Sequence, residues 1–376
     1  MASPKRTKYF SYQRLVVKLG TNVITKGDKL AAPRIANLAR QVAELRKAGL
    51  EVIIVSSGAI ALGKQELRLQ KRLKGVPFKQ VLASVGQTRL MEIYRELFRP
   101  YRIKVAQALL TRADILSRLG YLNARNTLLS LLDLEVVPIV NENDVVAVEE
   151  LEGTTFGDND SLSALVANLV DADLLLMLSD VAGLYTSDPE RDAAARLISR
   201  VEKIDTELEQ LAGGSSGEGT GGMLTKLEAA KLATSSGVAV VIADGKEPEV
   251  ILRVASGESL GTFFPPAVSR LESRKRWVLS LPVKGQLYVD PGAQAALQKQ
   301  YKSLLPAGVV KVEKEFERGE MVAVLDVLGN ELGRGIVNYS SGDIEVIKGH
   351  HSDEIQSLLG YEYGEEVIHR NNLVVL

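Results

Sequence analysis

Cysteine is absent from the 376-residue chain and histidine is scarce, occurring as His350, His351 and His369. The absence of cysteine excludes disulfides, thiolate zinc sites, iron–sulfur clusters and a cysteine nucleophile. Because the first 349 residues contain neither residue type, chemistry located there cannot use a Ser-His-Asp triad or a histidine-ligated metal. Lysine, carboxylate, amide and hydroxyl side chains remain, together with backbone amides, and this inventory suits charge stabilisation.

A charge excess is also missing, and aromatic residues are few. The net charge of −1 combines +4 over residues 1–276 with −5 over residues 277–376, and aromatic residues make up 5% of the chain. Proteins that bind nucleic acid usually have a basic excess and aromatic side chains that stack on bases. The composition therefore disfavours nucleic acid as a partner.

Long hydrophobic runs do not occur. The longest apolar stretches, such as residues 174–178, are far too short to cross a bilayer. The first eight residues are polar and basic, and no apolar segment follows that would make them a signal peptide. We therefore expect a cytoplasmic protein without a membrane partner.

Apolar runs typical of strands alternate with amphipathic helical patterns over residues 1–265. A helix is expected behind Pro33 and a longer one at residues 78–98. Strands are expected at residues 15–19, 52–55, 105–110, 136–140, 174–178 and 238–242. The alternation predicts an α/β fold with a mainly parallel sheet sandwiched by helices, whose ligands bind at the carboxyl ends of the strands.

The pattern changes after Pro265-Pro266, where a polar linker is expected over residues 266–280. One helical pattern, at residues 293–304, accompanies several short β-like pieces, at residues 286–289, 309–312, 321–325, 335–338 and 344–347. Residues 281–376 are therefore expected to form a small, mostly β domain. The adjacent His350 and His351 have no cysteine nearby and are more typical of a turn than of a metal site.

Lys18 ends the first predicted strand, and Gly20 follows it. The lysine ammonium is a compact charge and glycine lets the backbone approach, so this pair suits contact with a phosphate. The alternative is a lysine that reaches into solvent from the sheet edge, and this motif alone does not separate the two. The turn at residues 56–59 opens a helix with its backbone amides, which also suits an anion, although tight packing alone would favour small residues there.

Two polar clusters follow the fourth predicted strand. Residues 141–144 come directly after it, and Asp144 could accept a hydrogen bond from a substrate ammonium. The alternative is a turn whose Asn and Asp residues are there for conformational reasons. Residues 157–161 precede a helical run, and Asp158-Asn159-Asp160 exceeds what helix capping requires.

A glycine-rich segment at residues 213–222 leads into a helical pattern that contains Lys226. Backbone amides with a lysine in the first helical turn form an arrangement that cradles phosphates. No Gly-Lys-Ser/Thr occurs, which excludes a Walker A motif. The glycine spacing resembles that of a dinucleotide-binding motif, but the strand that must precede such a motif is missing. Ser179-Asp180 marks one more strand end.

All of these motifs lie at strand ends or helix starts of one α/β unit. Phosphoryl transfer depends on positioning and on neutralising the charge of the moving group, so lysines, backbone amides and carboxylates suffice without histidine. The residues therefore favour phosphoryl-transfer chemistry.

The same segments resemble the amino acid kinase superfamily, and within it the glutamate 5-kinases that carry a C-terminal PUA domain. The likeness spans nearly the whole chain, and the joint order of the motifs is more specific than any single one. The matching segments are residues 16–21, 57–61, 85–87, 110–114, 122–125, 141–144, 157–160, 183–186, 220–223 and 225–227, and in the C-terminal part residues 303–308, 349–352 and 359–364.

The resemblance implies ATP-dependent phosphorylation of the γ-carboxylate of L-glutamate in proline biosynthesis, with Mg²⁺ bound mainly through the nucleotide phosphates and no metal-ligating side chains. It assigns catalysis to Lys18, Lys226 and Asp160, the aspartate holding the lysines. Substrate binding is assigned to Ser57, Gly58, Ala59, Asn141, Asp144 and Asn159. Nucleotide binding is assigned to Lys18, Gly20, Ser179, Asp180, Thr220, Gly221, Gly222, Met223, Leu224, Thr225 and Lys226. The family also suggests a homo-oligomer and feedback inhibition by proline.

The chain departs from the family pattern at Ser179, where threonine is common, and residues 149–156 do not align. Two alternatives stay open. A sibling kinase for acetylglutamate, aspartate, carbamate or UMP would share most of the motifs, although the PUA-like tail and residues 141–144 favour glutamate. An RNA-binding protein acting through the PUA-like domain is the other, and the −5 charge of residues 277–376 stands against it.

Overall fold

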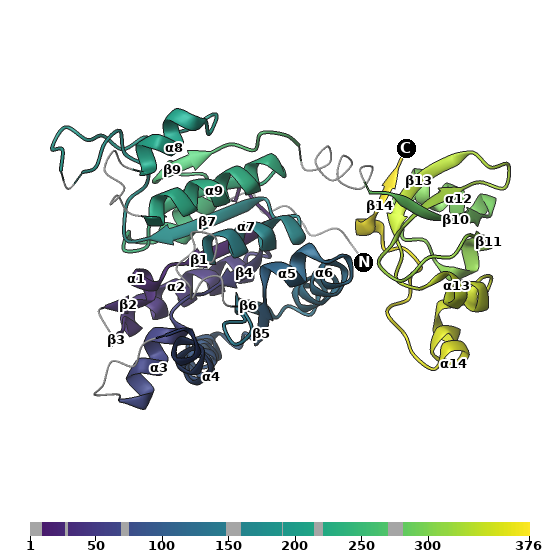
Figure 1. Cartoon of the computed structure of the whole chain (residues 1–376), viewed down its shortest axis with the longest axis horizontal. Coiled ribbons are helices and arrows are strands. Elements are labelled where there is room, and N and C mark those ends of the chain that lie inside the picture. The colour runs from purple at the N-terminus through teal and green to yellow at the C-terminus, as the bar shows by residue number, and fades with distance from the viewer. Residues whose placement is uncertain are drawn as a thin grey trace. The chain divides into compact units, whose positions relative to one another are not determined.

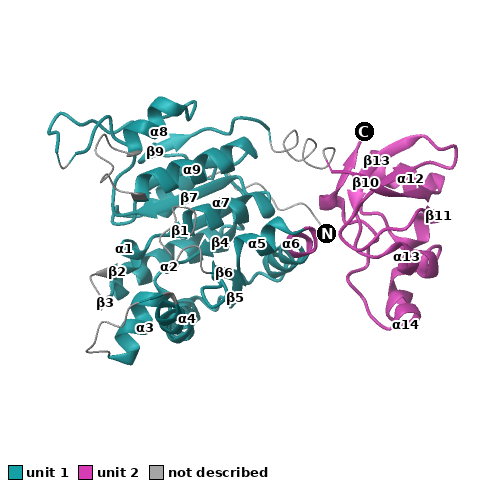
Figure 2. Cartoon of the chain, in the orientation of Figure 1, with its two compact units in different colours: residues 1–117, 123–270 teal, residues 118–122, 271–376 magenta. Residues whose placement is uncertain are grey.

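The computed structural model describes residues 10–26, 29–68, 75–147, 159–189, 191–213, 221–269 and 281–376. The chain divides into two compact units, Met1–Ser117 with Asn123–Arg270, and Arg118–Leu122 with Leu271–Leu376 (Figure 2). Each unit has a sheet of its own. The expected domain limits at residues 265 and 281 stay a prediction, because residues 270–280 lie outside the described ranges.

The larger unit is built on a sheet with the strand order β5-β6-β4-β1-β7-β8-β9 (Figure 1). Its bounds are β1 Arg14–Leu19, β4 Glu51–Val55, β5 Val105–Leu110, β6 Val137–Glu142, β7 Leu174–Ser179, β8 Ala239–Asp244 and β9 Thr262–Phe264. Neighbouring strands run parallel except β9, which is antiparallel to β8. The prediction of a mainly parallel sheet is confirmed. A small hairpin, β2 Thr25–Lys26 with β3 Lys29–Leu30, lies outside this sheet.

Helices cover both faces of the sheet. They are α1 Thr21–Ile24, α2 Ala32–Lys47, α3 Ala59–Leu67, α4 Val76–Phe98, α5 Arg112–Leu116, α6 Arg118–Asp133, α7 Asn159–Leu169, α8 Thr206–Gly213, α9 Gly221–Ser235 and α10 Val250–Ala255, with a 3₁₀ turn at Arg99–Tyr101. Side chains alternate along a strand, so Leu15, Val17 and Leu19 of β1 join an apolar cluster with α2, α4 and α10. Lys18 therefore points to the opposite face, which α7 and α9 cover.

The smaller unit has a sheet with the order β11-β10-β12-β13-β14. Its elements are β10 Val283–Val289, α12 Pro291–Gln300, β11 Val309–Glu313, β12 Met321–Leu325, β13 Glu331–Ile336, α13 Ser341–Ile347, α14 Ile355–Leu359 and β14 Leu373–Val375, with 3₁₀ turns at Pro306–Gly308, Ser352–Glu354 and Arg370–Asn372. An apolar cluster that includes Leu287, Val324 and Ile344 forms its core. The expectation of a small, mostly β unit is confirmed.

The predicted β-like piece at residues 344–347 is wrong, because these residues end helix α13. Ser340 caps that helix: its side chain accepts a hydrogen bond from the Asp343 N–H at 3.2 Å, and the Asp343 carboxylate accepts one from the Ser340 N–H at 3.1 Å. Such a reciprocal cap starts a helix whatever the β propensity of the residues behind it. The expectation of a single helix in this unit is also wrong, since α13 and α14 accompany α12.

β6 and β13 are among the strands whose bounds differ from the predicted ones. β6 continues two residues past the predicted end at Val140, because Leu109 and Leu110 of β5 extend the ladder to Asn141 and Glu142. The strand expected at residues 335–338 lies earlier, at Glu331–Ile336. Asn141 therefore belongs to the strand and not to the turn after it.

Across the described residues, no helix combines the length and the apolar character needed to cross a bilayer.

Candidate active site

Four of the predicted site residues lie at the carboxyl ends of four neighbouring strands. In sheet order these strands are β6, β4, β1 and β7, and their ends bring Asn141, Ser57, Lys18 and Ser179 to one edge. Because parallel strands are about 4.8 Å apart, the four ends span about 14 Å. A ligand of the size of a nucleotide with its acceptor can extend along such an edge.

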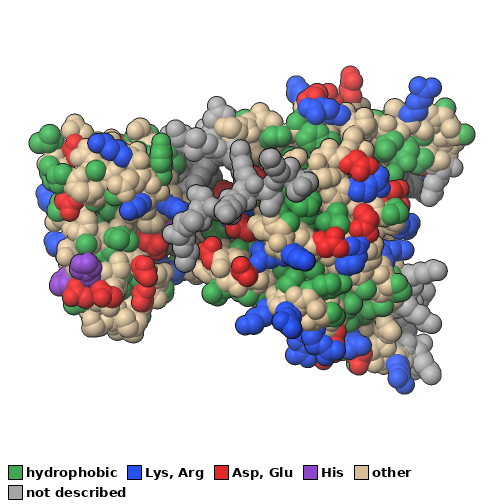
Figure 3. Space-filling model, turned by 180° about the vertical axis from the view of Figure 1, so that it is seen from behind, with side chains coloured by type: hydrophobic (Ala, Val, Ile, Leu, Met, Phe, Trp, Pro, Cys, Tyr) green, Lys and Arg blue, Asp and Glu red, His purple; other side chains and the backbone are tan. Residues whose placement is uncertain are grey.

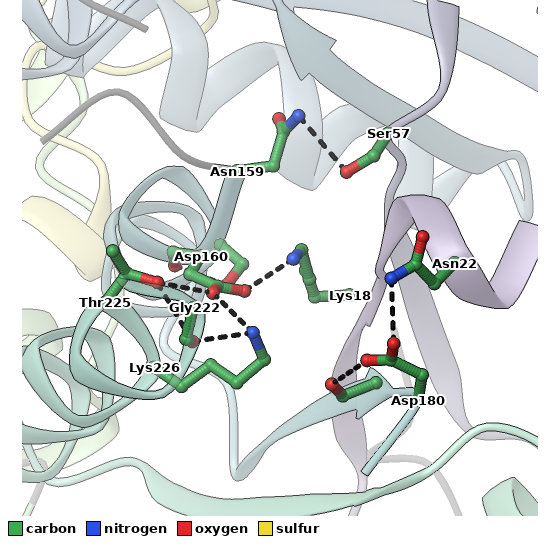
Figure 4. Close-up of polar contacts among 11 residues, drawn as sticks. Lys18, Asn22, Ser57, Asn159, Asp160, Asp180, Gly222, Thr225 and Lys226 are labelled. Carbon is green, nitrogen blue, oxygen red and sulfur yellow. Dashed lines mark hydrogen bonds and ion pairs between the residues drawn. The ribbon is translucent and has the colours of Figure 1, made fainter. Parts of the chain in front are cut away.

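Asp160 lies between two lysines (Figure 4). Its carboxylate is 2.5 Å from the Nζ atom of Lys18 and 3.1 Å from the Nζ atom of Lys226. All three side chains are buried, so the interpretation of Lys18 as a solvent-exposed lysine is wrong. The three together carry one net positive charge in a poorly solvated place, where an anionic group is bound strongly.

Helix α9 supplies two further contacts to this cluster. The Thr225 hydroxyl is 3.1 Å from an oxygen of Asp160 and 3.1 Å from the Gly222 carbonyl, to either of which it can donate. The Lys226 ammonium also donates to the Gly222 carbonyl, at 2.8 Å. Lys226 was predicted to lie in the first turn of this helix, but it is the sixth residue of α9. Its long side chain folds back to the helix start.

The rest of the predicted nucleotide segment is placed only in part. Gly221 begins α9, and Met223 and Leu224 are half-buried in its first turn. Thr220 lies outside the described residues, as do residues 149–156. Their roles stay predictions.

Ser57 and Asn159 join the β4 end to the start of α7. The Asn159 amide nitrogen donates to the Ser57 hydroxyl at 3.3 Å, and both side chains are buried. Gly58 adopts a left-handed φ of 94°, and a Cβ atom there would lie 2.5 Å from Ile24 Cδ1. Glycine is therefore required at this turn, which ends at Ala59, the first residue of α3.

A pocket of about 240 Å³ lies beside the end of β6. Its walls include Asp144, Glu142 and Gln87. Burial raises the pKa of Asp144 to about 6. Asn141, at the same strand end, donates from its side-chain amide to Gln87 Oε1 at 2.8 Å. Asp144 and Asn141, which were both predicted to bind substrate, thus lie at the same strand end.

Ser179 and Asp180 lie at the β7 end, beside the lysine cluster. The Ser179 hydroxyl donates to one oxygen of Asp180 at 3.2 Å, and the Asn22 amide donates to the other at 2.7 Å. Partial burial would raise the pKa of Asp180, but hydrogen bonds, led by the one from Asn22, hold it below its ordinary value. The Gly20 N–H donates to the Leu178 carbonyl at 3.0 Å, which holds the end of β1 against β7.

The sequence reasoning did not single out Gln87 or Asn22 as site residues. Both stand in or beside segments that carried the resemblance, residues 85–87 and 16–21. A glutamine inside a helix and an asparagine after a strand have no signature of their own, so only the fold reveals their partners.

Metal-ligating groups of three or more His, Asp or Glu side chains do not occur among the described residues. His350 and His351 lie in a turn of the smaller unit. Figure 3 shows histidine side chains of that unit beside acidic ones. The His350 Nδ1 atom is 3.0 Å from a Glu354 oxygen. This placement agrees with the turn interpretation.

The model of the amino acid kinase family matches residues 13–244, which is more than half of the chain. This chain belongs to the amino acid kinase family. A PUA domain model matches residues 285–359 of the same chain. The strand-end cluster around Asp160 thus lies in the amino acid kinase part, and the mostly β unit contains the PUA match.

Relatives of this amino acid kinase align over nearly its whole length. A glutamate 5-kinase from Dehalococcoides mccartyi (strain CBDB1) is 55% identical over 97% of this chain and 99% of its own. One from Herpetosiphon aurantiacus is 52% identical over 96% and 98%, and one from Deinococcus radiodurans is 50% identical over 96% and 100%. The likeness therefore includes both units of this amino acid kinase.

Proposed function

We propose that this amino acid kinase transfers the γ-phosphoryl group of ATP to the γ-carboxylate of L-glutamate, the first step of proline biosynthesis. The observation that carries the proposal is the buried Lys18–Asp160–Lys226 cluster at the end of the central strand. The names of the relatives support glutamate as the acceptor.

The reaction needs charge stabilisation more than proton transfer. A γ-carboxylate oxygen attacks the γ-phosphorus and forms an O–P bond, while the bond from phosphorus to the β,γ-bridging oxygen breaks and its electron pair leaves with ADP. A carboxyl group with a pKa of about 4.3 is already ionised at neutral pH, so no general base is required. Lys18 and Lys226 would neutralise the moving phosphoryl group, and Asp160 would hold both ammonium groups in place.

Glutamate would bind at the β6 and β4 ends. Asp144 would accept a hydrogen bond from the α-ammonium, and Ser57 and Asn159 would hold the acceptor carboxylate beside Lys18. The backbone at Gly58 and Ala59, at the N-terminus of α3, and the amide of Asn141 would complete this site.

The nucleotide would bind at the β7 and α9 side of the same edge. Asn22 fixes the orientation of Asp180 and the α9 start faces the lysines, which supports this side. The proposed contacts are Lys18, Gly20, Ser179, Asp180, Thr220, Gly221, Gly222, Met223, Leu224, Thr225 and Lys226.

Magnesium, when bound with ATP, offsets the charge on the β- and γ-phosphates and orients them. Asp160 is engaged with two lysines, and the described residues contain no cluster of three or more metal-ligating side chains. We therefore propose that the phosphates hold the ion.

An assay that couples ADP release to NADH oxidation tests the acceptor. Glutamate, acetylglutamate, aspartate, carbamate and UMP are each supplied with ATP and Mg²⁺, and hydroxylamine traps an acyl phosphate as its hydroxamate. We expect turnover and hydroxamate with glutamate. Turnover with another acceptor in place of glutamate contradicts the proposal, as does the absence of any glutamate-dependent ADP.

The proposal extends to regulation, assembly and location. We propose that proline inhibits by occupying the glutamate site, that the chain forms a homo-oligomer and that it works in the cytoplasm. Each rests on the resemblance or on composition. Competition between proline and glutamate in the same assay, and the mass measured by light scattering, test the first two.

A further inference from the structure

The pocket beside β6 has an unusual inventory of polar groups. Its walls carry the carboxylates of Glu142 and Asp144, the amides of Gln87, Gln107 and Asn143, and two hydroxyls. Lysine, arginine and histidine do not occur among its described lining residues. The carboxylates of such a pocket can bind an ammonium, but a carboxylate that enters it must be bound by neutral donors.

Gln87 is the most buried of these amide side chains, at 8% exposed. Its Oε1 atom accepts the 2.8 Å hydrogen bond from Asn141, which is 2% exposed. The Nε2 atom of Gln87 and the Oδ1 atom of Asn141 have no hydrogen-bond partner within the described part of the chain. A buried amide without partners is costly unless a ligand completes it, so this pair has one donor and one acceptor to offer.

The fold positions Gln87 through the residue before it. The preceding residue, Gly86, touches the backbone of α3 so closely that a Cβ atom there would lie 1.7 Å from the Ala59 carbonyl oxygen. Only glycine permits this approach. Helix α4 is therefore fixed beside Ala59, and the hydrogen bond from Asn141 places Gln87 at the end of β6.

We propose that Gln87 is a specificity-determining residue whose Nε2 amide donates to the α-carboxylate of the amino acid substrate. The α-ammonium then lies against Asp144, and the Asn141 hydrogen bond keeps the Gln87 amide oriented. This inference rests on the proposed function and adds the residue by which the enzyme distinguishes an α-amino acid from a simple ω-amino acid.

Two substrate analogues, used as competitive inhibitors, test the contributions of the α-carboxylate and of the ammonium separately. 4-Aminobutyrate has the ammonium and the acceptor carboxylate of glutamate but lacks the α-carboxylate, and glutarate lacks the ammonium. A site that hydrogen-bonds a substrate group discriminates strongly against the analogue without it. In the wild-type enzyme 4-aminobutyrate should therefore bind more weakly than glutamate, and Gln87 should account for much of the difference.

The decisive variant is Gln87→Glu. Its carboxylate can still accept the hydrogen bond from Asn141, so the packing contact remains, but the donor is replaced by an oxygen that repels the α-carboxylate. We expect the KM for glutamate to rise at least a hundredfold and the inhibition constant of 4-aminobutyrate to stay within about threefold. Gln87→Leu should raise the same KM about tenfold to a hundredfold with the same spared inhibitor.

Gln65→Leu is the matched control, because Gln65 is an exposed glutamine on the neighbouring helix α3. Its KM values should equal those of the wild type, and thermal unfolding checks that every variant is folded. An unchanged KM for glutamate in Gln87→Glu, or equal weakening of glutamate and 4-aminobutyrate in both variants, overturns the inference. Failure of the proposed function is seen separately, as a wild-type enzyme without glutamate-dependent ADP release.

Discussion

Charged groups at the end of β1 have partners in the structure, whereas two buried amide atoms beside the end of β6 have none among the described residues. At the ends of β1 and α7, Asp160 is buried between Lys18 and Lys226, and the opposite charges are in contact without any ligand. At the end of β6, burial raises the pKa of Asp144 to about 6, and the Gln87–Asn141 pair keeps an unused donor and acceptor. The first part is organised without a ligand, whereas we propose that the bound substrate completes the second.

The difference matches the two tasks of a group-transfer enzyme. Groups that stabilise a transition state act best when they are already oriented, because reorganisation during the reaction raises the barrier. Groups that select a substrate act best when an incorrect ligand leaves them unsatisfied. Substitutions on the two sides should therefore separate kcat from KM.

Removing the shared carboxylate should have the largest effect. Asp160→Ala leaves two buried ammonium groups facing each other, and breaking a buried pair costs about 3–5 kcal/mol. We expect the free energy of unfolding in urea to fall by that amount. The control is Glu209→Ala, which breaks the exposed 2.6 Å pair between Glu209 of α8 and Lys231 of α9 and should cost at most about 1 kcal/mol. Equal losses would contradict the distinction between the two pairs.

Removing either lysine should act mainly on the rate. In Lys18→Ala and Lys226→Ala, Asp160 keeps one ionic partner, so the fold should persist while kcat falls about 10²–10³-fold. Steady-state kinetics at saturating ATP and glutamate measure this. Lys231→Ala, an exposed lysine of α9, is the matched control and should leave kcat unchanged. A kcat within threefold of wild type in either active-site variant would remove that lysine from the proposed chemistry.

Neutralising the pocket acid should act on binding. Asp144→Asn is expected to raise the KM for glutamate about tenfold to a hundredfold, because a charge-assisted hydrogen bond to the ammonium is lost, and to change kcat little. Inhibition by glutarate, which has no ammonium, should not weaken. The exposed Asp133→Asn serves as the control. A fall in kcat with an unchanged KM would indicate that Asp144 acts in phosphoryl transfer and not in glutamate binding.

The pH dependence of KM should show the smallest effect. Because burial raises the pKa of Asp144 to about 6, its carboxylate is mostly ionised at pH 7.5 and mostly protonated at pH 5. Binding of the α-ammonium should weaken as the pH falls through 6, so the KM for glutamate should rise about tenfold over that range. In Asp144→Asn this rise should disappear, and its persistence would assign the titration to another group.

The sequence predicted the catalytic unit well because each motif stands at a strand end of a parallel sheet. Lys18, Ser57, Asp144 and Ser179 follow apolar runs whose direction is known once the α/β alternation is recognised. The residues alone do not show which of them meet, and the expectation that Asp160 holds the two lysines comes from the family resemblance. The contact of Asp160 with Lys226 joins residues 66 positions apart, and no local pattern encodes that distance.

The errors have local causes. Residues 344–347 are mostly apolar and favour a strand, but Ser340 and Asp343, three residues apart, form the cap that starts helix α13. The sequence does not single out Gln87, because its position depends on Gly86, which brings two helices into backbone contact. A glycine in a helical pattern does not reveal which residue it contacts.

The alternation of side chains along β1 has a consequence for folding itself. In the native register Val17 faces the apolar cluster formed with α2 and α4, and Lys18 faces away from it. A slip of one residue in this central strand would turn Lys18 into that cluster and Val17 out of it. An ammonium buried there without a partner costs several kcal/mol. The lysine proposed to stabilise the moving phosphoryl group therefore also disfavours the shifted register of its own strand during folding.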